Sequence, residues 1–93
     1  MKYSVNWVQT KSGNAAKQGQ VVTINVAEAD FIVYGVYKDG FPVLVGQTRP
    51  GDNEDSFILK RKGIDLKGKA TLKVSAYNKK GNRFGWTDEF NII

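Results

Sequence analysis

The chain has 93 residues, 41% of them hydrophobic, and a net charge of +5 at pH 7. This length gives one domain with one thin core, and the composition is typical of a globular protein. The absence of cysteine and histidine excludes disulfides, thiol chemistry and Ser-His or Cys-His nucleophiles. Carboxylates, lysines, tyrosines and hydroxyls remain, but no motif pairs two carboxylates as a glycosidase acid and base, and a 93-residue sandwich offers little cleft. We therefore expect a protein that is not an enzyme and that uses no metal or cofactor.

Residues 1–19 are expected to form a strand or a docking arm followed by a loop. Apolar side chains alternate with polar ones at the start, which predicts a strand from about Lys2 to Gln9. The stretch from Thr10 to Gly19 is small and polar and predicts a loop. No apolar signal segment is present, and the longest nearly apolar run, Phe31 to Tyr37, is too short to span a bilayer. We therefore expect no membrane insertion.

Three strands are predicted in the middle of the chain: Gln20 to Val26, Phe31 to Lys38, and Pro42 to Thr48. The second of these is apolar on both sides, which is typical of a central strand, and Gly35 within it indicates a bulge or a close neighbour. Asp39-Gly40 between two apolar runs predicts a tight hairpin. Pro42 favours the edge of a sheet or the first position of the return strand.

The last third of the chain predicts a short strand and then a long hairpin. After the polar loop Arg49 to Asp55, a strand is expected from Ser56 to Lys60, followed by a basic connection from Arg61 to Lys69. The stretch Leu72 to Trp86 reads as two strands joined by a turn, and the second strand continues to Ile93. The fold class is therefore predicted to be all-β, a single antiparallel β-sandwich of about seven strands.

The order and spacing of these elements resemble the immunoglobulin-like superfamily, and most nearly its fibronectin type III domains. The resemblance covers about residues 20–93 and is carried by Tyr34 to Gly40, Val45 to Thr48, and Leu72 to Thr87. One departure is Ala70, where that family usually has a tyrosine whose hydroxyl pins a corner. The resemblance implies a single immunoglobulin-like domain over 1–93 and does not by itself imply a function.

Basic side chains are concentrated in residues 60–83, which hold nine of them against the single acidic residue Asp65. A solvated surface is the ordinary role of such charges on a sandwich. The next alternative is that these side chains bind an acidic protein partner. Nucleic acid is a weaker alternative, because lysine lacks the bidentate geometry that reads bases. Gly51 to Asp55 clusters oxygen donors but lacks EF-hand spacing, so we expect a solvated turn and no calcium site. Trp86 is expected in the core, and Trp7 either in the core or in a partner contact.

We expect a non-catalytic structural or accessory protein of a larger assembly. A short, Met-initiated immunoglobulin-like chain without thiols resembles the small proteins that decorate tailed-phage particles. That resemblance implies a capsid or other virion protein as partner, and a location in the virion or the cytoplasm of the producing cell. One alternative is a spacer or carbohydrate-binding module of a secreted or cell-surface glycan-active protein, which would be extracellular. Another is a nucleic-acid-binding protein that uses residues 60–83. The candidate partner-binding residues are Tyr3, Val5, Trp7, Lys60, Arg61, Lys62, Lys79, Lys80 and Arg83.

Overall fold

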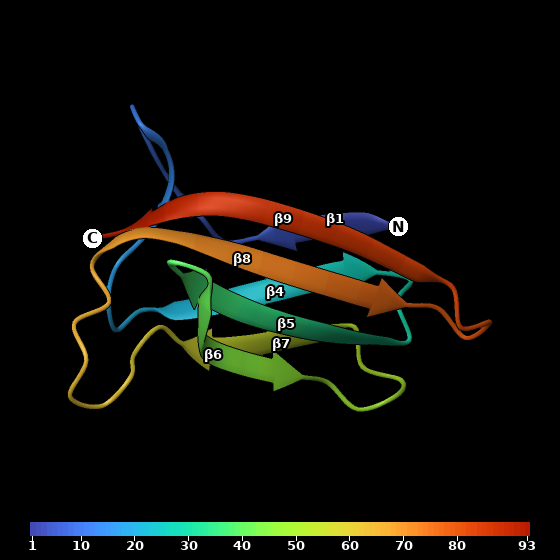
Figure 1. The fold of residues 1–93 in the computed structure, drawn as a ribbon. Helices are drawn as coiled ribbons and strands as arrows, with labels where there is room; N and C mark the ends of the chain where they lie inside the picture. The colour runs from blue at the N-terminus through green and yellow to red at the C-terminus, as the bar shows by residue number, and fades with distance from the viewer.

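A computed structural model describes all residues from 1 to 93 as β-strands, turns and connections, with no helix (Figure 1). It therefore has no helix that could cross a membrane. The nine strands are β1 (Lys2–Val5), β2 (Val8–Thr10), β3 (Gly13–Ala16), β4 (Val21–Ala27), β5 (Phe31–Lys38), β6 (Phe41–Gln47), β7 (Glu54–Ile58), β8 (Gly68–Tyr77) and β9 (Arg83–Ile92). The sequence predicted about seven, and both additional strands lie in residues 1–19.

The strands form two sheets, an arrangement that is compatible with a β-sandwich (Figure 1). A three-stranded sheet has the order β1-β4-β7, and a six-stranded sheet has the order β2-β3-β9-β8-β5-β6. Neighbouring strands run antiparallel except β3 and β9, which are parallel. The all-β prediction is confirmed.

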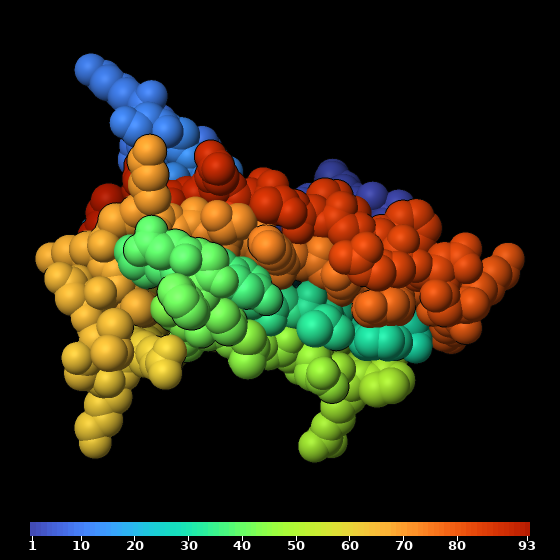
Figure 2. Space-filling model, in the orientation of Figure 1, coloured from blue at the N-terminus to red at the C-terminus, as the bar shows by residue number.

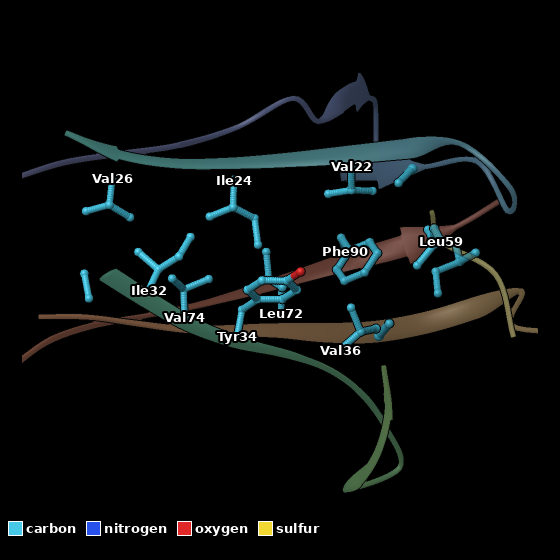
Figure 3. Packing of buried hydrophobic residues seen from close by; sticks show 14 of the residues in the cluster. Val22, Ile24, Val26, Ile32, Tyr34, Val36, Leu59, Leu72, Val74 and Phe90 are labelled. Carbon is cyan, nitrogen blue, oxygen red and sulfur yellow. The ribbon is translucent and has the colours of Figure 1, made fainter. Parts of the chain in front are cut away.

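A single core of sixteen buried residues holds the sheets together. Strand alternation sends one set of side chains inward from β4, β5 and β8. Figure 3 shows the side chains of β4 directed toward those of the other sheet. Burying one aliphatic side chain of this kind stabilises the fold by about 1.5–3 kcal/mol. The contributors at the centre include Val22, Ile24 and Val26 of β4, Ile32, Tyr34 and Val36 of β5, and Leu72 and Val74 of β8.

The N-terminal segment changes sheets, which the sequence did not predict. The expected strand from Lys2 to Gln9 is interrupted at Asn6, whose side-chain Oδ1 accepts a hydrogen bond from the Thr23 backbone N–H at 2.7 Å. The chain then forms the β2–β3 hairpin, and β3 pairs with β9. The prediction of a loop from Thr10 to Gly19 is wrong, because Ala15 and Ala16 lie in β3 and are fully buried.

Two predicted hairpins are confirmed. Asp39 and Gly40 have φ angles of 51° and 81°, as a two-residue turn between twisted strands requires. Pro42 lies in β6, the edge strand of its sheet, and a register shift marks the β5–β6 pairing between Val36 and Tyr37. The second turn, which joins β8 and β9, is held by Asn78–Asn82, where the Asn78 side chain accepts two backbone hydrogen bonds.

The connection between β7 and β8 is packed onto the body rather than free. Leu66 is fully buried, its N–H donates to Gln18 Oε1 at 2.5 Å, and its carbonyl accepts from Lys38 Nζ at 2.8 Å. The strand predicted before it, Ser56 to Lys60, begins and ends two residues earlier, as β7. Leu59, just past its end, is nonetheless fully buried.

Each edge strand of the three-stranded sheet is tied to the six-stranded sheet by a tyrosine–aspartate hydrogen bond. On the β1 side, Tyr3 Oη donates to Asp88 Oδ2 at 2.6 Å. On the β7 side, Tyr34 Oη donates to Asp55 Oδ2 at 2.5 Å, and its ring stacks on Phe57 with centroids 5.2 Å apart. Burial, and then the adjacent carboxylate, raise the pKa of both tyrosine hydroxyls.

Candidate functional site

The three N-terminal candidates, Tyr3, Val5 and Trp7, are half-buried and pack against the core. The Trp7 ring lies 4.5 Å from that of Phe90, measured between centroids, and its Nε1 donates to Asp88 Oδ2 at 3.4 Å. All three therefore contribute to the packing of the fold, and Tyr3 and Trp7 contact β9 through Asp88 and Phe90.

Trp86 is also half-buried and packs against the core. Its ring stacks on Tyr3, with centroids 5.0 Å apart and planes 11° apart. Each tryptophan ring is therefore engaged with another aromatic ring of the fold.

The basic candidates are spread along the molecule. Lys60, Arg61 and Lys62 are exposed in the β7–β8 connection, and Lys79 and Lys80 are exposed in the β8–β9 turn. The two segments lie at opposite ends of the long axis (Figure 1). They are separated by the ten-residue strand β8, which is about 30 Å long. The basic residues of 60–83 are thus strung along one direction rather than gathered into one patch.

The outer face of the six-stranded sheet, directed away from the core, is hollowed. Two adjoining hollows of about 430 and 480 Å³ lie on it and share Tyr37 and Lys73. We call them together the outer trough. One hollow lies between Asn14 of the β2–β3 hairpin and Asp39 of the β5–β6 turn, and the other lies over β5, β6 and β8. Figure 2 shows the β2–β3 hairpin (blue) standing out from the body above the β5–β6 hairpin (green).

The centre of the trough is built on Gly35. A Cβ at this position would lie 2.9 Å from Tyr37 Cε1, so the absence of a side chain lets the tyrosine ring lie close against the sheet. Lys73, which pairs with Gly35 across β5 and β8, places its Nζ 4.8 Å from the centroid of that ring. This is a cation–π contact at an accessible site.

The trough combines donors and acceptors along both of its halves. Arg83 is the one candidate from the sequence that lines it, and its Nε donates to Ser75 Oγ at 3.1 Å. Thr71 and Glu89 lie in the half nearer the β2–β3 hairpin. Hydroxyl, amide, guanidinium, ammonium and carboxylate groups around one aromatic ring are suited to recognition by hydrogen bonds and stacking.

Acidic side chains do not gather into a metal site. The structure contains no group of three or more side chains that could hold a metal ion. At the start of β7, Glu54 Oε1 accepts a hydrogen bond from Asn25 Nδ2 at 3.2 Å, while Asp55 accepts from Tyr34. These two carboxylates are therefore engaged with separate partners.

Sequence reasoning missed the trough because its parts lie on different strands. The alternation of β5 and of β8 indicated which residues face away from the core, but not that Tyr37 and Lys73 meet. That juxtaposition depends on the register of β5 against β8, which no local pattern encodes.

No protein-family model matches the chain, and no curated protein matches it in sequence.

Proposed function

We propose that this protein is a non-catalytic accessory module with an immunoglobulin-like fold, which binds an extended segment of a larger assembly in the outer trough. The immunoglobulin-like assignment is supported by strand order. The sheets β1-β4-β7 and β9-β8-β5-β6 correspond to the orders A-B-E and G-F-C-C′ of that superfamily. The N-terminal segment contributes to both sheets through β1 and β3.

The observation that carries the binding proposal is the trough itself. Apart from the core residues Tyr34, Ala70 and Phe90, the residues that line it do not belong to the buried core. Both hollows lie on a hydrogen-bonded sheet, and one of them lies between two projecting hairpins, which favours a fixed shape. The proposed occupant is an extended, acidic protein segment, because Lys69, Lys73 and Arg83 outnumber Asp39 and Glu89 along the lining.

The assembly that the family resemblance suggests is a tailed-phage particle, with a capsid or other virion protein as the partner. Under this proposal, the protein co-sediments with large particles from producing cells. Lys73→Glu reverses the charge at the centre of the trough and is expected to reduce the bound fraction at least tenfold. Lys80→Glu, with the same charge change in the β8–β9 turn, is the matched control and leaves binding within twofold. If Lys80→Glu reduces binding and Lys73→Glu does not, the docking surface is the β8–β9 turn.

Carbohydrate binding is a second candidate, and the placement of Tyr37 favours it. An aromatic ring lying against a sheet and flanked by hydroxyl and amide groups is suited to stack on a sugar ring and to bind its hydroxyls. A glycan array followed by calorimetric titration tests this candidate, with Tyr37→Ala expected to abolish the heat of binding. Binding to no glycan, or binding that Tyr37→Ala leaves unchanged, would eliminate it.

A further inference from the structure

Strand β6 is a free edge of the six-stranded sheet and is unusually apolar for that position. Its sequence, Phe41–Gln47, contains no charged residue, and the side chains of Phe41 and Val45 are each 72% exposed. Edge strands usually carry charges, prolines or bulges that prevent pairing with another chain. In β6 such protection is confined to the first half, which contains Pro42 and the register shift of the β5–β6 pairing.

The second half of β6 presents backbone groups without partners. Just beyond its end, the Thr48 N–H donates to the Ile32 carbonyl at 2.9 Å, so the backbone of Thr48 faces β5. In an antiparallel pair the backbone direction alternates from residue to residue. The N–H and C=O groups of Val45 and Gln47 therefore point away from β5. No other segment of the chain pairs with this edge.

The charges that bracket β6 make the strand complementary to itself. Asp39 precedes it and Arg49 follows it, and both are exposed. An antiparallel pair of two copies centred on Val45 places the turn that contains Asp39 at the same end of the contact as Arg49 of the second copy. Opposite charges then meet at both ends of the contact. A parallel pair would instead bring like charges together.

We propose that two copies of this protein pair antiparallel through their β6 edges and join their six-stranded sheets into one continuous sheet. The contact is isologous, because the same strand is used by both copies. It involves one short strand from each, so it is a weak and reversible interface. The two-fold axis stands perpendicular to the sheet, so both outer troughs face the same side. The pairing does not depend on what binds in the troughs.

The test is sedimentation equilibrium of the full chain over a wide range of concentrations. The wild type is expected to show a mass that rises toward that of a dimer. Val45→Lys places two ammonium groups against each other at the axis and is expected to weaken dimerisation at least tenfold. Ile58→Lys is the matched control, because Ile58 is 58% exposed on β7, an edge strand of the other sheet. It is expected to leave the dimer unchanged.

A charge exchange tests the direction of pairing and does not alter the exposed apolar side chains. Asp39→Arg alone is expected to weaken the dimer, and the double variant Asp39→Arg, Arg49→Asp is expected to restore it. In the wild type, amide exchange at Val45 and Gln47 is expected to slow as concentration rises. A mass that stays monomeric at every concentration overturns the proposal. So does equal weakening by Ile58→Lys, or failure of the double variant to recover.

Discussion

Gly46 of β6 is the position where one added methyl group is expected to do most damage. A Cβ there would lie 2.3 Å from Tyr34 Oη and 2.4 Å from Tyr34 Cζ. The ring cannot swing aside freely, because it stacks on Phe57 and its hydroxyl donates to Asp55 at 2.5 Å. Gly46→Ala therefore either leaves an overpacked contact or breaks the Tyr34–Asp55 hydrogen bond that connects β5 to β7.

The geometry sets the size of the effect. Relieving the contact needs a displacement of about 1 Å, which lengthens the tyrosine–aspartate hydrogen bond beyond its useful range. Overpacking costs about 1–3 kcal/mol, and a hydrogen bond to a charged group contributes about 1.5–3 kcal/mol. We expect the free energy of unfolding to fall by about 2–4 kcal/mol, out of roughly 5–15 kcal/mol for a domain. The melting temperature should drop by at least about 8 °C.

Urea unfolding followed by tryptophan fluorescence measures this loss. Gly85→Ala is the control, because a Cβ there would meet Arg83 Nη2 at an ordinary 3.4 Å. It should be neutral or slightly stabilising. In a Tyr34→Leu background, Gly46→Ala should cost less than about 0.5 kcal/mol, because the opposing ring is gone. A Gly46→Ala protein as stable as the wild type, or an equal loss in both backgrounds, would refute the reasoning.

Three further predictions concern stability. The pKa values of Tyr3 and Tyr34 are raised in the fold. Their stabilising contribution is therefore complete below the unfolded pKa of about 10 and is lost as pH rises above it. Urea titrations should show a lower free energy of unfolding at pH 11 than at pH 8, and a double Tyr→Phe variant should largely remove this difference. Leu66→Ala should lower the free energy of unfolding by about 2–5 kcal/mol. Ile64→Ala, at a nearby residue that is 51% exposed, should lower it by less than about 0.5 kcal/mol. Equal losses in the two variants would contradict the packing of the β7–β8 connection. Asp88→Ala should cost about 1–3 kcal/mol by removing the acceptor of two side-chain donors, and Asp88→Asn should cost less because its amide oxygen still accepts.

The parts of the fold that the sequence predicted are those governed by local pattern. The boundaries of β5 matched the expected Phe31 to Lys38, because both faces of the strand are apolar and turn residues flank it. The alternation of Leu72, Val74 and Ala76 correctly indicated the buried face of β8. Asp39-Gly40 supplied the positive φ angles that the hairpin needs.

The N-terminal segment was mispredicted because its structure depends on distant partners. Ala15 and Ala16 are small residues in a polar stretch, and neither shows a strand pattern. They are buried because β3 lies beside β9 in a parallel pairing, from the other end of the chain. The change of sheet at Asn6 likewise depends on its hydrogen bonds to β4, with Thr23 and Val21.

The candidate site could be predicted only in part from the sequence, for the same reason. Arg83 was selected for its charge, and it does line the outer trough. Tyr3, Val5 and Trp7 were selected for alternation and aromatic character, which describe inward packing equally well. Tyr37, at the centre of the trough, gave no signal of its own, because its position over Gly35 and beside Lys73 follows from three-dimensional register.

Site-specific photo-cross-linking tests the central claim, that the outer trough holds the partner, most directly. A photoreactive residue replaces Thr71, in the trough, or Thr23, a half-exposed threonine on the three-stranded sheet. Both proteins are irradiated in producing cells, and the assembled particles are then isolated. We predict an adduct of one defined mass from position 71 and none from position 23. An adduct from position 23 alone would place the contact on the opposite sheet and contradict the account.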